Sequence, residues 1–318
     1  MPATFSDRAW ERLRCSHCGE GLAPADGGAR CLACGQTYPL TGAGSLDLRL
    51  KKPKPYAVEY TLGRPLLPEN GFRFEPLAMH PQPRVAFSGV RIPWHLSDTL
   101  MSHFPKADVA GSAMLDLGCG NGVHREVCEH AGFEWVGLDY ADAQAPILGD
   151  AHSLPFKAQA FDFILSIAVL EHIQFPSVMM REAHRVLKPG GRFIGTVAFL
   201  EPFHGDSYYH HTHLGTFNSL RAAGFTVEQV APVKGWSVLT AQASTLFPRM
   251  PAFLSRGLLY PLDALHRLWW RAARLVSDKA DENIRLNKTS GAFAFIASKP
   301  LIGPEHATEE GQRERAPG

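Results

Sequence analysis

The stretch that decides the fold is Leu115-Asp116-Leu117-Gly118-Cys119-Gly120-Asn121-Gly122. The apolar residues 113–117 predict a short buried strand, the glycines predict a tight turn, and residues 123–130 predict a helix. Glycine lets the backbone turn sharply and lets a ligand approach without interference from a Cβ atom. Because ligands of open α/β sheets bind beyond the carboxyl ends of the strands, this turn is a candidate ligand site.

Strands and helices are expected to alternate on both sides of this turn. After the strand at 113–117, we expect strands at 133–139, 146–149, 161–168, 192–199, 225–233 and 292–298. Helices are expected at 93–104, 123–130, 176–187 and 216–223. This alternation predicts an α/β fold with a Rossmann-like, doubly wound, seven-stranded sheet.

The spacing of the glycines separates two classes of cofactor. A dinucleotide-binding fingerprint reads G-x-G-x-x-G, but here the third glycine comes one residue early, at Gly122, and Val123 stands at the fingerprint position. This spacing argues against a dehydrogenase. The pattern D-x-G-x-G-x-G from Asp116 to Gly122 instead resembles motif I of class I S-adenosylmethionine-dependent methyltransferases, of the type 11-like group.

Further matches to this family follow in the family's order and cover residues 113–233. They are Val136-Gly137-Leu138-Asp139, Gly149-Asp150-Ala151, Leu154-Pro155-Phe156, Phe161-Asp162 followed by residues 166–172, and the turn at 185–191. The resemblance implies S-adenosylmethionine as cofactor. The cofactor-binding residues that it implies are Asp116, Gly118, Gly120, Asp139, Asp150, Ala151 and Ile167. The ten residues between Asp139 and Asp150 depart from the pattern and predict that the usual intervening helix is lost or reduced to a turn.

Four cysteines form two Cys-x-x-Cys pairs near the N-terminus: Cys15, Cys18, Cys31 and Cys34. Four thiolates at this spacing predict a tetrahedral Zn²⁺ site, which is structural because the cysteines saturate the metal. Free or redox-active cysteines are the alternative. Residues 13–50 resemble a zinc-ribbon family that includes the small activator subunit of tRNA methyltransferases and often precedes bacterial methyltransferase domains.

The loop expected after the fifth strand is rich in histidine and tyrosine. It contains His204, Asp206, Tyr208, Tyr209, His210, His211 and His213. We expect this loop to bind the methyl acceptor, with His204 or His210 as general base and His172 as a further base candidate. A second metal site using His204, Asp206 and later histidines, and a purely structural polar loop, are the alternatives.

Residues 236–290 form an insertion before the last strand. Apolar residues recur in it at helical spacing: Leu254, Leu258, Leu262, Leu265, Trp269, Ala272 and Val276. We expect a helical lid over the acceptor pocket. The alternatives are an interfacial helix in peripheral contact with a membrane, given Trp269, Trp270 and nearby arginines, and ordinary core packing.

Length, composition and charge set the remaining bounds. We expect the 318 residues to divide into a zinc-binding module at 1–50, a Pro-rich linker and covering helix at 51–110, a methyltransferase domain at 111–300 with the helical insertion 236–290, and a disordered tail at 301–318. A net charge of +1 disfavours a nucleic acid partner without excluding one. No stretch has the length of a membrane span or the pattern of a signal peptide, which predicts a cytoplasmic protein.

These observations predict methyl transfer from S-adenosylmethionine to a small-molecule or glycan-type acceptor, at oxygen. An RNA methyltransferase guided by the zinc module is one alternative. Against it stand the near-neutral charge and Ser166-Ile167-Ala168-Val169 where an Asn/Asp-Pro-Pro-Tyr motif would be needed. A non-catalytic partner protein with a methyltransferase fold is the other alternative, which the intact glycine loop disfavours.

Overall fold

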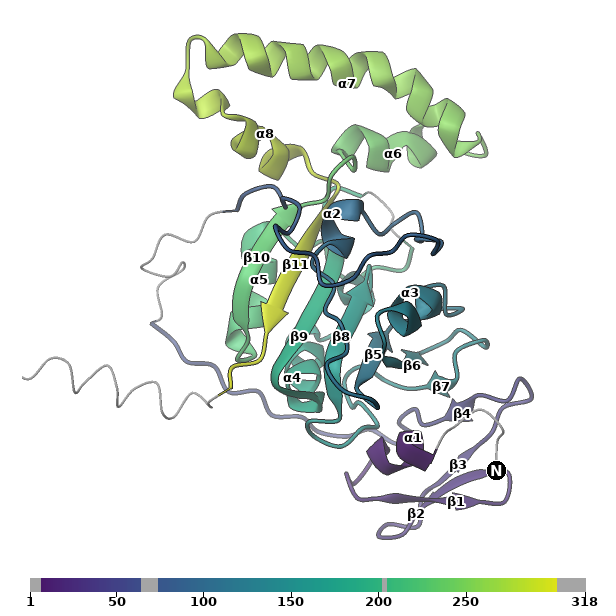
Figure 1. Cartoon of the computed structure of the whole chain (residues 1–318). Coiled ribbons are helices and arrows are strands. Elements are labelled where there is room, and N and C mark those ends of the chain that lie inside the picture. The colour runs from purple at the N-terminus through teal and green to yellow at the C-terminus, as the bar shows by residue number, and fades with distance from the viewer. Residues whose placement is uncertain (1–6, 64–73, 202–204, 302–318) are drawn as a thin grey trace, which may run out of the picture.

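A computed structural model describes residues 7–63, 74–201 and 205–301, and its centre is one eight-stranded sheet (Figure 1). In spatial order, the strands are β10 (Thr226–Pro232), β11 (Ala292–Ser298), β9 (Leu187–Ala198), β8 (Phe161–Ile167), β5 (Ala113–Leu117), β6 (Glu134–Asp139), β7 (Ile147–Leu148) and β4 (Leu46–Asp47). Only β11 runs antiparallel to its neighbours. The mixed α/β fold with a large parallel sheet that the sequence predicts is thereby confirmed.

The two faces of the sheet bury alternate residues of the same strands. Leu115 and Ile164 pack on one face, together with residues of α4 (Pro176–Val186) and α5 (His213–Ala222). Met114 and Phe163 pack on the other face, with residues of α2 (Asp98–Met101) and α3 (Arg125–His130). Because side chains of a strand point alternately to opposite faces, strands apolar throughout become the middle layer between helices.

The covering helix expected at 93–104 is much shorter than predicted. Only Asp98–Met101 is helical. The helix starts there because the Ser97 side chain accepts the N–H of Leu100 as an N-cap. It ends there because the Ser102 hydroxyl turns back onto the carbonyl of Thr99. Leu96 and Phe104 are still buried against the sheet, so the irregular segment satisfies the apolar pattern without a longer helix.

The N-terminal module is a small three-stranded antiparallel sheet beside the far edge of the main sheet (Figure 1). It contains α1 (Asp7–Arg12), β1 (Leu22–Ala25), β2 (Gly28–Cys31) and β3 (Thr37–Pro39). The chain then continues into β4, which pairs in parallel with β7. This pairing is the reason that the main sheet has eight strands rather than the expected seven.

The module also contacts the domain of the main sheet through backbone hydrogen bonds. The N–H of Arg14 donates to the carbonyl of Pro155, and the N–H of Lys157 donates to the carbonyl of Arg12, 3.0 and 2.8 Å apart. Leu13 and Phe156, both fully buried, form the bridge between these bonds. The two parts therefore share core and backbone pairing rather than a flexible tether.

The insertion between β10 and β11 is helical and stands over the sheet (Figure 1). It consists of α6 (Val238–Leu246), α7 (Ala252–Arg274), the 3₁₀ helix Asp278–Ala280 and α8 (Glu282–Thr289). The apolar stripe expected to face a pocket includes Leu258, Leu265 and Trp269, which are 57%, 62% and 71% exposed. That stripe is exposed to solvent rather than facing a pocket, whereas Ser255 of the same helix is buried. No helix of the described residues has the length and apolarity to cross a membrane.

Candidate active site

The glycine loop connects β5 to α3 in a conformation that requires glycine. Gly118, Gly120 and Gly122 all have positive φ, at 76°, 51° and 80°. The N–H of Gly118 donates to the carbonyl of Leu138, which ties the loop to the end of β6. A Cβ atom on Gly118 would lie 2.3 Å from Val169 Cγ2. The sequence-predicted turn is therefore a tight, Cβ-free surface at the carboxyl ends of the strands.

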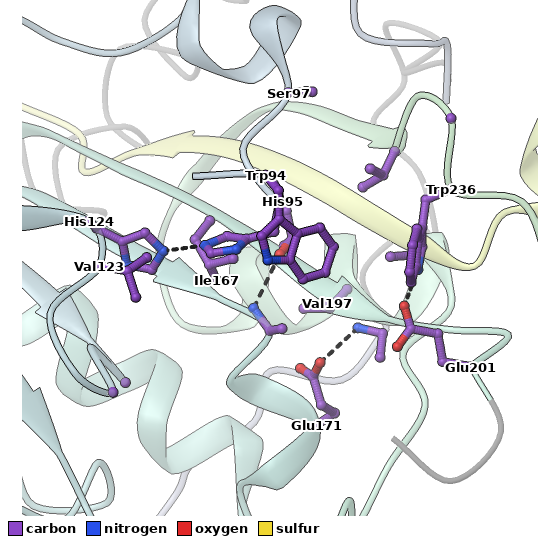
Figure 2. Close-up of a pocket in the computed structure, with 18 of the residues that line it drawn as sticks. Trp94, His95, Ser97, Val123, His124, Ile167, Glu171, Val197, Glu201 and Trp236 are labelled. Atoms are coloured by element: carbon purple, nitrogen blue, oxygen red, sulfur yellow. Dashed lines mark hydrogen bonds between the residues drawn. The ribbon is translucent and has the colours of Figure 1, made fainter. Parts of the chain in front are cut away.

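A cavity of about 450 Å³ opens against this loop (Figure 2). Gly118 and Gly120 line it from the loop, and Ile167 lines it from the end of β8. The opposite wall comes from segments distant in sequence, with Trp94 and His95 before α2, Trp236 before α6, and Arg256 on α7. The two tryptophan rings lie 6.1 Å apart between centroids. This volume lies within the range of small-molecule sites.

Of the three predicted cofactor acids, Asp139 lies at a strand end and contacts the loop directly. Asp139 ends β6, and its carboxylate accepts the N–H groups of Gly120, Ala141 and Asp142 at 2.9–3.0 Å. The last two bonds form a compact turn, so β7 follows without an intervening helix, as the sequence predicts. Asp139 thus touches the backbone of a cavity-lining glycine, although Asp139 itself does not line the cavity.

Asp150 follows β7 and is fixed by its neighbour His152. The Asp150 carboxylate accepts both the backbone N–H and the ring Nδ1–H of His152, at 2.9 and 2.7 Å. The His152 Nε2 atom in turn accepts the N–H of Phe175. Burial would raise the pKa of Asp150, but the two hydrogen bonds from His152 outweigh it and the pKa is lowered. Asp150 and Ala151 lie outside the lining of the cavity.

Asp116, the third predicted acid, is completely buried beneath the loop. Its carboxylate lies 3.1 and 3.2 Å from His124 Nδ1 and accepts the indole N–H of Trp135 at 3.1 Å. The other nitrogen of His124, Nε2, lies 2.7 Å from Nε2 of His95 (Figure 2). Both histidines line the cavity. Asp116 therefore reaches the cavity through two imidazole rings rather than by its own carboxylate.

The sequence-predicted base candidates lie elsewhere. His204 falls outside the described residues. His210 is exposed, and His172 is half-buried in the 3₁₀ helix Leu170–His172; neither lines the cavity. His211 and His213 are more buried, and burial lowers the pKa of both. His213 packs edge-on against Phe74, 4.3 Å between ring centroids, a packing role that the sequence pattern does not distinguish from a catalytic one.

Two buried carboxylates also line the cavity, Glu171 after β8 and Glu201 after β9. Glu171 Oε1 accepts the N–H of Ala198, and Glu201 Oε1 accepts the indole N–H of Trp236 (Figure 2). The carbonyl of Glu171 also accepts the N–H groups of Tyr208 and Tyr209. These contacts fasten the histidine-rich loop and the Trp236 wall to the strand ends.

The four N-terminal cysteines converge on one point. Their sulfur atoms all lie within 4.8 Å of one another, with Cys18 and Cys31 3.4 Å apart and Cys15 and Cys34 3.7 Å apart. Each Cys-x-x-Cys pair is followed by a glycine at positive φ, Gly19 or Gly35, whose N–H donates to the carbonyl of the first cysteine. The two Cys-x-x-Cys pairs of the sequence thus lie next to each other, as a shared metal site requires.

Residues 115–195 match the family model of a methyltransferase domain. The matched segment begins in β5, contains the glycine loop and the ends of β6 and β8, and finishes within β9. The match to a methyltransferase domain therefore includes the glycine loop and the strands that position it.

Among curated proteins, the chain is similar to ubiquinone biosynthesis O-methyltransferases. It is 33% identical over 97 residues to that of Ruegeria pomeroyi, which covers 26% of this chain and 39% of the relative. It is 29% identical over 138 residues to that of Roseobacter denitrificans, covering 39% and 54%. The chain thus spans about half, or less, of these relatives' length. A solved S-adenosylmethionine-dependent methyltransferase from Mesorhizobium loti aligns at 19% identity and a TM-score of 0.39, covering 63% of this chain and 95% of that one.

Proposed function

We propose that the protein transfers the methyl group of S-adenosylmethionine to an oxygen atom of a small-molecule acceptor. The observation that carries this proposal is the position of the cavity. It opens against Gly118 and Gly120, at the carboxyl ends of the parallel strands, within the segment that matches a methyltransferase domain.

The residues at the loop fit S-adenosylmethionine. Because Gly118 and Gly120 have no Cβ atom, a ligand can approach their backbone closely. A carboxylate at the end of the second parallel strand is suited to the two hydroxyls of a ribose, and Asp139 stands there. Asp150 and Ala151 would contact the adenine side, and Ile167 would line the floor. When bound, the cofactor supplies an electrophilic methyl group.

The acceptor side of the cavity favours a flat, apolar molecule with a hydroxyl group. Trp94 and Trp236 present aromatic surface to the cavity, and Arg256 lies 5.1 Å above the Trp236 ring. The similar relatives are named as O-methyltransferases, which supports oxygen as the acceptor atom. RNA methylation remains the rival activity, and the net charge of +1 gives it no electrostatic support.

The histidine-rich loop remains a proposed contributor to acceptor binding. Tyr208 and Tyr209 attach it to Glu171, which lines the cavity. His210 and His204 would act from this loop, and His172 from the 3₁₀ helix beneath it. A drop in turnover of the H210A variant at unchanged cofactor affinity is expected; unchanged turnover in both H210A and H204A would remove the loop from the acceptor site.

Cofactor binding is tested by isothermal titration calorimetry with S-adenosylmethionine. We expect the wild type to bind and Asp139→Ala to bind at least ~10-fold more weakly, since a hydrogen-bonded carboxylate contributes about 1.5–3 kcal/mol. Glu126→Ala, an exposed acid on the neighbouring α3, is the control and should bind like the wild type. The acceptor is sought by mass spectrometry of cell extracts incubated with deuteromethyl-labelled cofactor. Absence of binding would overturn the enzyme proposal and favour a non-catalytic partner role.

We further propose that the cysteine cluster holds one structural Zn²⁺. Four sulfur atoms 2.3 Å from a tetrahedral Zn²⁺ lie roughly 3.8 Å apart, and the separations of 3.4 and 3.7 Å are close to that value. The cluster joins β1–β3 to the segment carrying Leu13 and Arg14. The metal would therefore stabilise the surface on which the module contacts the sheet domain.

A further inference from the structure

Three hydrogen-bonded side chains connect the interior of the sheet to the cavity. Asp116 lies on β5, His124 directly precedes α3, and His95 lies on the covering segment before α2. Asp116 is 0% exposed and His124 is 5% exposed. The contacts are 3.1 Å from Asp116 to His124 Nδ1 and 2.7 Å between the Nε2 atoms of the two histidines. The turn between β5 and α3 and the covering segment before α2 thus meet in one hydrogen-bonded chain of side chains.

The partners of each atom decide where the protons lie. A carboxylate only accepts hydrogen bonds, so His124 Nδ1 must carry a proton that it donates to Asp116. A neutral His124 then has an unprotonated Nε2, and the short contact requires His95 Nε2 to donate to it. The remaining ring nitrogen of His95, Nδ1, is consequently left with a lone pair. A histidine that lines the cavity is thereby held in one tautomer by a buried acid.

Resting on the proposed O-methylation, we propose that His95 is the catalytic base for the acceptor hydroxyl and that His124 and Asp116 position it and take up the charge. As the acceptor O–H bond breaks, its proton goes to His95 Nδ1, and the Nε2 proton of His95 moves to His124 Nε2. The acceptor oxygen forms a bond to the methyl carbon, and the S–CH₃ electron pair stays on sulfur. One positive charge disappears at sulfur, and one appears on His124 beside Asp116.

The groups around His95 favour its uncharged form before the reaction. Burial, with His124 beside it, lowers the pKa of His95 to about 4 against the opposing influence of Asp116. The other ionisable groups that line the cavity are Glu171, Glu201, Lys234 and Arg256 together with Cys119. Burial, with Asp116, Asp139 and Asp142 nearby, raises the pKa of the Cys119 thiol, so this group stays protonated. His95 therefore has an unprotonated nitrogen at neutral pH, which a base requires.

The proposal makes a prediction that needs no acceptor. A cationic sulfonium bound in this cavity disfavours a proton on His95, whereas neutral S-adenosylhomocysteine does not. Near pH 4, where the pKa of His95 lies, binding of S-adenosylhomocysteine should therefore leave more protons bound than binding of S-adenosylmethionine, by up to about one proton, and the difference should vanish at neutral pH. The difference is measured by calorimetry of both ligands in buffers of different ionisation enthalpy.

Two variants test the assignment. His95→Gln should abolish this difference in proton uptake, because glutamine keeps a hydrogen-bonding side chain but does not titrate. His130→Gln, a change of an exposed histidine on α3, should retain it. In the extract assay with labelled cofactor, His95→Gln should lower methyl transfer about 10²–10⁴-fold, with cofactor affinity within threefold of the wild type.

The outcomes separate the two proposals. The role of His95 as catalytic base is refuted if the wild type binds S-adenosylmethionine but shows no difference in proton uptake. It is also refuted if the difference persists in His95→Gln. In both cases the cofactor proposal stands. Undiminished methyl transfer by His95→Gln also refutes the role of His95. If S-adenosylmethionine does not bind at all, the proposed function itself fails. Asp116→Asn, which keeps the shape of the buried side chain, should shift the pH dependence of methyl transfer, and an unchanged pH profile would contradict the positioning role of Asp116.

Discussion

Glu182 on α4 joins the N-terminal module to the sheet domain. Its replacement should weaken the contact between them and lower the free energy of unfolding. Its side chain is 4% exposed. It accepts Arg14 from the module at 3.2 Å, the N–H of Leu154 at 2.9 Å, and Arg185 from its own helix at 2.8 and 2.7 Å. Glu182→Gln keeps the shape but removes the charge and turns an NH₂ group toward the arginines.

The expected loss follows from this geometry. Breaking one side of a buried ion pair costs about 3–5 kcal/mol. The side chains of Arg14 and Arg185 retain 18% and 23% exposure, so water partly solvates the charges left behind. We therefore expect the free energy of unfolding to fall by about 3 kcal/mol, the lower end of that range.

Urea denaturation followed by circular dichroism measures this loss. Glu228→Gln removes a more exposed partner of Arg192 and should change stability by less than about 1 kcal/mol. Hydrogen exchange at the amides of Arg14 and Lys157, which bridge the module and the sheet domain, should accelerate in Glu182→Gln only. A loss below about 1 kcal/mol with unchanged exchange would show that the network does not hold the module in place.

Three further changes have expected outcomes. Gly118→Ala should abolish S-adenosylmethionine binding in calorimetry, because its Cβ would meet Val169 at 2.3 Å, whereas Gly89→Ala, at positive φ but in open space, should leave binding intact. Metal analysis should find one Zn²⁺ per chain, and Cys18→Ser or a chelator should lower both the zinc content and the melting temperature; retained zinc in Cys18→Ser would argue against four-cysteine ligation. Burial and Lys299 lower the pKa of His184 to about 4, so its stabilising contribution is complete above the unfolded pKa of about 6.5 and is lost as pH falls toward 4. His184→Gln should flatten the decline of unfolding free energy in that window, and an unchanged slope would contradict the assignment.

The strands of the main sheet could be predicted because their information is local. The apolar runs at 113–117 and 292–298 coincide with β5 and β11. A strand buried on both faces has no competing polar pattern, so its sequence alone delimits it. By contrast, β4 is two residues long and has no period to detect. It forms only because β7 offers an unpaired edge about a hundred residues later in the chain.

Some residues of the candidate site could likewise be predicted from the sequence, and others could not. The glycine loop and Asp139 could be placed from spacing, because turn geometry and strand ends leave a residue pattern. His95 could not, since it lies in an irregular Pro-rich segment, and its partner His124 is 29 residues away. The proximity of Asp116 to His124, eight residues apart, was a usable signal. It places both residues around one turn, but it does not reveal that a third segment completes the line.

The pairing of β4 with β7 constrains how the chain is built on the ribosome. Leu46 emerges early, but its partner Ile147 is synthesised only about a hundred residues later. With the proposed Zn²⁺ bound, the module could fold first and offer β4 as the partner of β7 when the rest of the sheet forms. Once β7 docks, the module covers an edge that would otherwise expose unpaired backbone groups to neighbouring chains. If the cysteines hold the proposed Zn²⁺, a chain without the metal would leave this edge uncovered, and we expect more of the protein to aggregate during its synthesis.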